Sequence, residues 1–139
     1  MAEFRKLIPA GHQATSEARR TIVRFAASWF DGEALTDIQL AAGEALANAA
    51  EHGFRPGTEI EIRCSCDGHA LIIEIRDAGT GFRPPRRRKA PPTGAPRGYG
   101  ITIMRTLMDR VRYSHNGTRV RLTKFVSPAR SATLDEELA

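Results

Sequence analysis

Residues 60–77, with the sequence IEIRCSCDGHALIIEIRD, decide the fold class of this 139-residue chain. Apolar residues occupy every second position in 60–66, and the alternation resumes in 71–75. A period of two is typical of a strand with one buried face. The intervening Asp67-Gly68 predicts a two-residue turn. The stretch therefore predicts an antiparallel hairpin with one apolar face.

The two cysteines of the chain, Cys64 and Cys66, both lie in the first strand of this hairpin. Residues two apart on a strand point to the same face, and the sequence holds no second cysteine pair for a four-ligand zinc site. We therefore interpret both as small buried side chains rather than as a disulfide or metal ligands.

Three segments with helical periodicity surround the hairpin. Apolar residues recur at three- and four-residue steps from about Gln13 to Phe30, which predicts an amphipathic helix. A capping box of Thr36 and Gln39 predicts that a second helix begins at Thr36 and runs to about His52, with Gly53 as its terminator. A third helix is predicted over residues 101–109.

A short strand is predicted over residues 3–8 and a second hairpin over 111–122, with Asn116-Gly117 at its turn. These elements predict an α+β fold, a two-layer sandwich with helices on one face of a mostly antiparallel, mixed sheet. The length fits one domain. We expect this domain to span residues 1–125 and residues 126–139 to form a flexible tail.

The formal charge of +5 comes from one segment. Residues 82–97 (FRPPRRRKAPPTGAPR) hold six of the 21 basic residues, so the remainder has 15 basic against 16 acidic residues. The five prolines of this segment predict an extended loop. The count predicts no broad basic face and disfavours direct nucleic-acid binding.

Because no apolar run could cross a membrane or serve as a secretory signal, we expect a cytoplasmic protein without membrane contact.

The second helix carries Glu44, Asn48 and His52 at four-residue steps, which places them on one face among many alanines. Small neighbours allow a ligand to approach the helix, and an amide oxygen on Asn48 suits Mg²⁺ that is also held by phosphate. The carboxylate of Glu44 could accept a proton or orient a nucleophile. The alternative is a helix that simply exposes three polar groups.

Asp77 continues the alternation of the second hairpin strand, so its carboxylate points to the apolar face. A buried carboxylate needs a partner, and an adenine amino group would serve, with Gly79 and Gly81 admitting a flat base close to the backbone. The alternative is a strand that ends in an ordinary turn.

Gly98 and Gly100 open the third helix, where exposed N–H groups and the helix dipole favour phosphate. Thr118 shares the alternation of the closing strand, and its hydroxyl should lie beside Asp77 if the two strands are neighbours. Taken singly, these two features have ordinary alternatives, a flexible hinge and a strand threonine.

Taken together, these signals resemble the ATPase family shared by gyrase-type topoisomerases, Hsp90 chaperones, sensor histidine kinases and MutL. Within it, the chain looks most like the bacterial anti-sigma-factor serine kinases. The segments that carry the resemblance are EALANAAEHGF (44–54), GYGITIMRTLMDRV (98–111) and GTRVRLTKF (117–125). The resemblance implies the ATP-binding sandwich of that family, the Bergerat-type fold.

The resemblance also implies roles for single residues. Glu44 would be the general base and Asn48 the Mg²⁺ ligand, while Asp77 would accept the adenine amino group with help from Thr118. The glycines would shape the adenine pocket and flank the phosphates; they are Gly79, Gly81, Gly98 and Gly100. Residues 82–97 would form the lid over ATP.

The function implied is a serine/threonine-protein kinase that phosphorylates a small anti-sigma-factor antagonist and binds and inhibits a sigma factor. A homodimer through the sheet or the first helix is implied by the resemblance alone. Two alternatives stay open: an ATP-binding regulatory module with another partner or without phosphotransfer, and a basic nucleic-acid-binding protein.

Overall fold

The computed structural model describes residues 1–53, 58–79 and 99–127. The elements in chain order are β1 (Ala2–Pro9), α1 (His12–Ala26), α2 (Gly32–Gly53), β2 (Glu59–Cys66), β3 (Ala70–Arg76), α3 (Tyr99–Leu107), β4 (Arg110–Ser114) and β5 (Arg119–Phe125). Within these ranges, no helix combines the length and apolar character needed to span a membrane. The proposed lid, Gly81, Gly98 and residues 128–139 lie outside the described residues.

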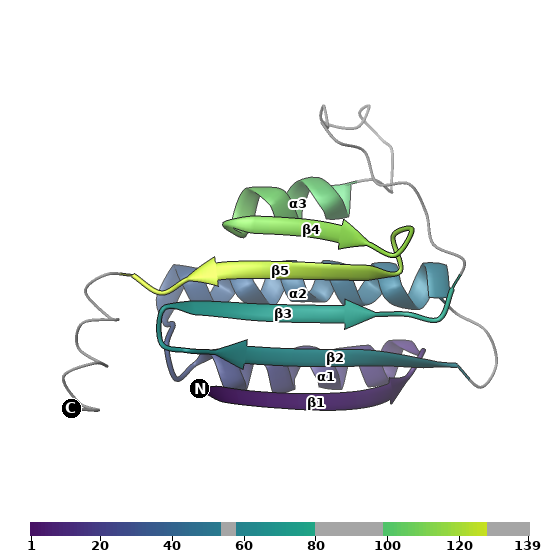
Figure 1. The fold of residues 1–139 in the computed structure, drawn as a ribbon, viewed down its shortest axis with the longest axis horizontal. Helices are drawn as coiled ribbons and strands as arrows, with labels where there is room; N and C mark the ends of the chain where they lie inside the picture. The colour runs from purple at the N-terminus through teal and green to yellow at the C-terminus, as the bar shows by residue number, and fades with distance from the viewer. Residues whose placement is uncertain (54–57, 80–98, 128–139) are drawn as a thin grey trace.

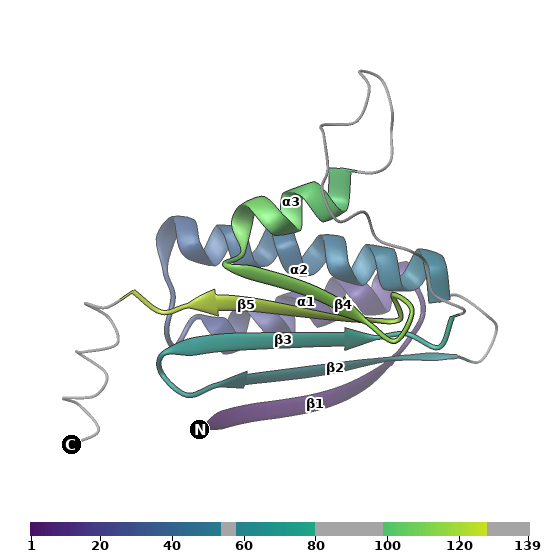
Figure 2. The same ribbon diagram turned by 45° about the horizontal axis from the view of Figure 1, so that its top comes forward.

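The five strands form one sheet in the order β1-β2-β3-β5-β4, and each neighbouring pair is antiparallel. The helices cover one face of this sheet, as Figures 1 and 2 show, with α2 between α1 and α3. The α+β sandwich is thus confirmed. The expected parallel component of a mixed sheet is absent from the described strands.

The core lies between these two layers and follows the predicted alternation. Alternate residues of β2 and β3 are almost fully buried against α1 and α2, and fully buried side chains include Ile22, Ile38, Ile62, Ile73 and Leu122. Val126, which we assigned to the tail, is also buried, and its N–H donates to the His69 carbonyl at 2.8 Å. Burial of this single apolar layer is the main stabilising term for the fold.

The boundary predicted between the first two helices is wrong. Helix α1 ends at Ala26, and α2 begins at Gly32, four residues before the predicted Thr36. The Thr36 hydroxyl donates to the Gly32 carbonyl at 3.3 Å, so Thr36 lies in the second turn of the helix and does not cap it. A threonine bonded back to the preceding turn is compatible with a helix interior.

Both hairpin loops are longer than the predicted two residues. In the first, Cys66 pairs with Leu71, and the Asp67 carboxylate accepts hydrogen bonds from the N–H groups of His69 and Ala70. In the second, Ser114 pairs with Arg119. A local side chain–backbone bond stabilises a longer loop that sequence spacing alone does not reveal.

The face of the sheet away from the helices corrects the charge prediction. Strand register places Arg5, Arg63, Glu74, Arg121 and Arg112 in one row across all five strands. A whole-chain charge count missed this basic face because most acidic residues that balance these arginines lie elsewhere on the molecule.

The two cysteines are buried and free, as predicted. Burial raises the pKa of the Cys64 thiol to about 12 and raises that of Cys66 as well. The raised pKa means that the neutral thiol of Cys64 favours the folded state at neutral pH. This contribution declines as the pH rises through the interval between the unfolded pKa of 9.0 and about 12.

We therefore expect neither thiol to react with Ellman's reagent in the native protein in mildly alkaline buffer, because reaction requires an exposed thiolate. Both thiols should react after unfolding in guanidinium chloride. Rapid reaction of a native thiol would contradict the buried position of these side chains.

Candidate functional site

Those predicted site residues that the structure describes come together at one end of the sandwich. The end of β3, the β4–β5 turn, the later turns of α2 and the start of α3 all lie at the right-hand side of Figure 1. Four segments distant in sequence thus form one site between the helix layer and the sheet.

Asn48 occupies the wall of this site on α2. It lines a small cavity together with Ala45 and Ala49, whose side chains are 1% and 5% exposed. The alanines allow α2 to pack close to the sheet, so their first role is packing of the helix, and two of them also border the cavity. His52 belongs to α2, but its side chain is outside the described residues.

Glu44 and Asn48 lie against the first turn of α3. A Cβ atom built on Gly100 would be 2.8 Å from the Glu44 Oε2 atom, 3.6 Å from Asn48 Nδ2 and 3.7 Å from Asn48 Oδ1. Because only glycine fits without displacing the carboxylate, the α3 backbone can approach both polar groups. The positive end of the α3 dipole therefore lies next to an acid and an amide.

Gly100→Ala tests this contact. The added methyl should push the Glu44 side chain aside, whereas the helical backbone accepts alanine, so the free energy of unfolding should change by less than about 1 kcal/mol. If Glu44 acts on a bound ligand, activity should fall while the melting temperature is nearly unchanged. Unchanged activity would show that the carboxylate position does not matter.

Asp77 lies directly after β3 and borders the same cavity as Asn48. Its side chain is 8% exposed, its N–H donates to the Thr118 carbonyl at 2.9 Å, and its Oδ1 atom accepts the Gly79 N–H at 2.7 Å. The backbone is thus fixed on both sides, and Gly79 holds one carboxylate oxygen in place. A buried carboxylate oriented in this way can accept a hydrogen bond from a ligand amino group.

Thr118 is also on the cavity wall, and its backbone carbonyl accepts the Asp77 N–H, so the two strands are neighbours. Its hydroxyl donates to the His115 carbonyl at 2.8 Å, within the β4–β5 turn. Since a hydroxyl has one proton, Thr118 can offer a ligand or water only its acceptor lone pairs. The turn therefore sets the orientation of this side chain.

Tyr113 completes the cavity and was not among the predicted site residues. It lies on the helix-facing side of β4, pairs with Val120 and contributes to the lining opposite α2. Burial raises the pKa of its hydroxyl, and interaction with the Asn48 side chain acts in the opposite direction. The alternation of Val111 and Tyr113 was the signal that could have identified it.

The cavity itself is almost closed among the described residues, with about 10 Å³ of free space for a water-sized group. An adenine ring does not fit into that volume. Any ligand larger than a water molecule that reaches Asp77 must therefore approach from outside this cavity.

Glu44 also borders a second, more open groove of about 340 Å³ between α1 and α2. Ser16 and Arg19 line this groove from α1, and the Arg19 Cδ atom would be 3.2 Å from a Cβ on Gly43. The Arg19 Nε atom is buried and has no hydrogen-bond partner among the described residues. A cationic side chain and the Glu44 carboxylate therefore line the same groove.

Comparison with known proteins agrees with this geometry. Residues 8–124 match the family described as histidine kinase-like ATPase domain. The chain belongs to the histidine kinase-like ATPase family. The match includes the α2 acid and amide, Asp77 and the start of α3, so in this ATPase domain the site described above is the candidate for ATP binding.

Several relatives of this ATPase domain bear the name anti-sigma F factor. The protein from Bacillus subtilis (strain 168) is 32% identical over 130 residues, which cover 86% of this chain and 89% of the relative. The protein from Anoxybacillus flavithermus (strain DSM 21510 / WK1) is 32% identical with the same coverage. That from Bacillus thuringiensis (strain Al Hakam) is 34% identical over 126 residues, covering 83% and 86%.

Proposed function

We propose that this ATPase domain binds ATP with Mg²⁺ and phosphorylates a serine or threonine of a small antagonist protein, and that it also binds and inhibits a sigma factor. The family and the names of the relatives support the nucleotide and the sigma-factor connection. Phosphotransfer, Mg²⁺ and the antagonist are our own proposals; the resemblance to the anti-sigma-factor serine kinases implies them, and the arrangement of side chains is compatible with them.

The contact of Gly100 with Glu44 and Asn48 carries this proposal. It brings an acid, an amide and a helix N-terminus within a few ångströms, with a side chain excluded between them. Phosphoryl transfer depends mainly on positioning and on electrostatic stabilisation of the phosphates. These groups provide both at one point.

Each residue then has a defined task. The Asp77 carboxylate accepts a hydrogen bond from the adenine amino group, and the Asn48 amide oxygen provides a ligand for Mg²⁺. When bound, Mg²⁺ neutralises charge on the phosphates. Glu44 accepts the proton of the attacking hydroxyl. We also propose that Gly98 and Gly81, outside the described residues, border the nucleotide with Gly79 and Gly100.

The groove between α1 and α2 supports the approach of a protein acceptor. Glu44 borders this groove, and Arg19, whose guanidinium group is a hydrogen-bond donor, lines it from α1. A backbone carbonyl or carboxylate of the partner could satisfy that donor while its hydroxyl reaches Glu44.

Incubation with radiolabelled ATP, Mg²⁺ and candidate small single-domain antagonists tests the proposal. We expect label on one such protein, on serine or threonine. If ATP binds but none of the antagonists that bind the protein is labelled, the protein is instead a regulatory nucleotide-binding module without phosphotransfer.

A further inference from the structure

The open face of the sheet carries two adjacent rows of charged side chains. The first contains Arg5, Arg63, Glu74, Arg121 and Arg112. The second, one pleat along, consists of Leu7, Glu61, Arg76, Arg119 and Ser114. The two rows therefore hold six arginines against two glutamates, on the opposite side of the sheet from the candidate ATP site.

Only part of this positive charge is balanced within the face. Arg5 and Arg63 share Glu61, with nitrogen–oxygen distances of 2.6 and 3.3 Å, and the Arg121 Nε atom donates to Glu74 at 2.8 Å. Within the described ranges, the other three arginines make no ion pair with a carboxylate; they are Arg76, Arg112 and Arg119. The face thus offers guanidinium groups to an acidic partner.

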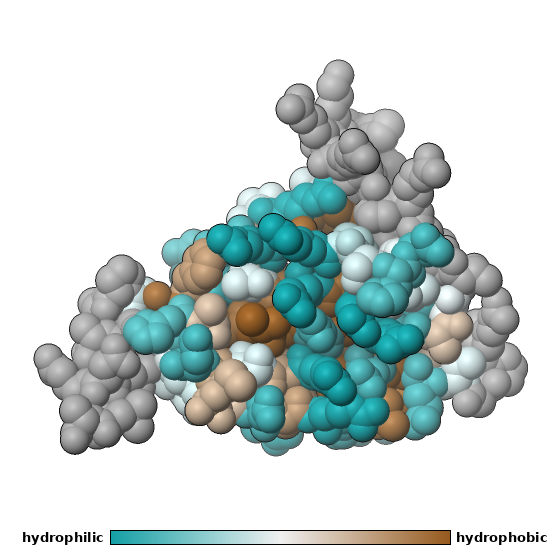
Figure 3. Space-filling view, in the orientation of Figure 1, coloured by the Kyte–Doolittle hydropathy of each residue, from teal (hydrophilic) through white to brown (hydrophobic). Residues whose placement is uncertain are grey.

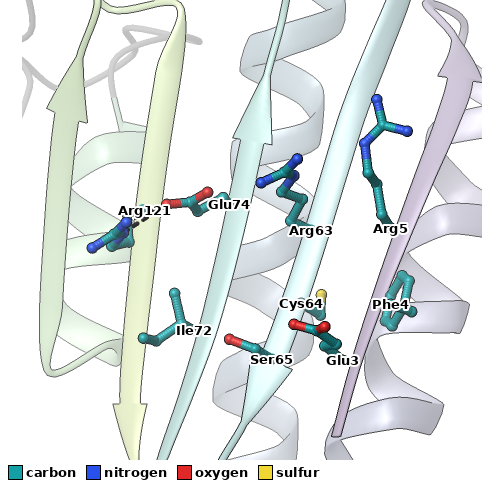
Figure 4. Close-up of a pocket in the computed structure, with 9 residues that line it drawn as sticks. All are labelled: Glu3, Phe4, Arg5, Arg63, Cys64, Ser65, Ile72, Glu74 and Arg121. Carbon is teal, nitrogen blue, oxygen red and sulfur yellow. Dashed lines mark hydrogen bonds and ion pairs between the residues drawn. The ribbon is translucent and has the colours of Figure 1, made fainter.

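A hollow of about 570 Å³ lies among these arginines. Ile72 and Ser65, which are paired across β3 and β2, lie at its base, and Figure 4 shows Arg63 and Glu74 projecting from the same two strands. Figure 3 shows an apolar area surrounded by hydrophilic side chains on this face. An apolar base within a charged rim is the usual arrangement of a protein-binding hot spot.

The composition of the hollow favours a protein over a nucleic acid. The apolar side chain of Ile72 lines it, and an apolar side chain of a protein can cover that position, whereas a phosphate backbone cannot. Among the described residues of this face, Phe125 is an exposed ring, and the Arg110 guanidinium, 5.5 Å from its centroid, already occupies one of its two faces, which leaves little aromatic surface for base stacking.

The same charges disfavour a second copy of this chain. Packing two such faces against each other would bring arginine rows together, and like charges at an interface oppose association. Charge complementarity therefore selects a different protein with an acidic surface.

We infer that the open face of the sheet is a docking surface for an acidic segment of a partner protein, with an apolar side chain over Ile72 and carboxylates on Arg63 and Arg121. The guanidinium groups of these two arginines keep N–H donors that their ion pairs with Glu61 and Glu74 do not use. This inference goes beyond the proposed phosphotransfer and does not depend on it. A partner on this face leaves the nucleotide face and the α1–α2 groove free, so both can be occupied at once.

Fluorescence anisotropy with a labelled peptide tests this inference. The probe has one central leucine flanked on each side by three glutamates. We expect binding that weakens about tenfold or more for R63E/R121E, because two attractive contacts become repulsive. The milder R63Q/R121Q should weaken binding less, and replacing the leucine of the probe by alanine should also weaken it.

The matched control is R20E/R24E on α1, which changes the same charge away from the sheet. Equal loss of binding in both charge-reversal variants would overturn the inference, since only net charge would then matter. Tighter binding of labelled duplex DNA through Arg63 and Arg121 would make the face a nucleic-acid surface. If sedimentation shows that the wild type is a dimer and that R63E/R121E is a monomer, the open face of the sheet is instead an interface between copies of this chain.

Two measurements keep this test separate from that of the ATP site. The R63E/R121E protein should retain the wild-type shift in melting temperature on addition of ATP, because its substitutions are on the opposite face. The melting temperature itself should fall somewhat, because the ion pairs with Glu61 and Glu74 are lost. Conversely, D77N should bind the acidic peptide like the wild type. Loss of peptide binding in D77N would contradict two independent sites.

Discussion

Asp77→Asn should remove nearly all of the thermal stabilisation that ATP gives the wild-type protein. In the wild type, one carboxylate oxygen accepts the Gly79 N–H, and in our proposal the carboxylate also accepts the adenine amino group. Asparagine can keep only one acceptor oxygen, so its NH₂ group would face the adenine donor. The variant loses a charge-assisted hydrogen bond and places its own NH₂ donor against the amino group of adenine. The affinity for ATP should therefore fall by about 100-fold.

The effect is measurable by differential scanning fluorimetry. At an ATP concentration near 100 times the dissociation constant, the wild type gains about 2.7 kcal/mol, which corresponds to several degrees in melting temperature. D77N at the same concentration should gain less than about 0.5 kcal/mol. Asp67→Asn, in the exposed β2–β3 loop, is the matched control and should keep the full shift.

The comparison of ATP with GTP makes this prediction sharper. Guanine has a carbonyl oxygen where adenine has its amino group, so the Asp77 carboxylate should reject GTP. In D77N the amide NH₂ can donate to that oxygen, so the ratio of the affinity for ATP to the affinity for GTP should decrease. A wild-type ATP shift in D77N would refute the role of Asp77 in adenine recognition.

The second large effect is expected for Glu44→Gln. Glutamine keeps the shape of the side chain against Gly100 but cannot take up a proton, so transfer to the antagonist should slow by about 10²- to 10⁴-fold. ATP binding should stay within about threefold of the wild type, because Glu44 does not line the cavity that holds Asp77. Single-turnover transfer of label measures the first quantity and calorimetry the second.

Glu17→Gln on the exposed part of α1 is the control and should transfer phosphate at the wild-type rate. If E44Q also transfers phosphate at that rate, another group accepts the proton. If E44Q loses ATP binding as well, Glu44 instead holds the nucleotide.

Short-range patterns predicted much of this architecture. Alternation identified both hairpins and the inward side chain of Asp77, because burial of one face of a strand imposes a period of two. The four-residue spacing of Glu44 and Asn48 likewise placed them on one helix face. The start of α2 was mispredicted because a local capping signal at Thr36 was overridden by the turn that follows α1.

The rest depends on contacts between segments distant in sequence. The approach of Gly100 to Glu44 results from the packing of α3 on α2, and no local pattern encodes it. The arginine rows arise from strand register, which brings Arg5 and Arg121 onto one face. A charge count along the chain averages over faces and therefore missed this surface.

Isothermal titration calorimetry of the folded wild-type protein with ATP and Mg²⁺ tests the central claim most directly. We predict saturable binding with one nucleotide per chain, and loss of that binding in D77N. A folded sample with magnesium present that gives no binding heat at several temperatures, and no change in melting temperature, would contradict a nucleotide site between α2, β3 and α3.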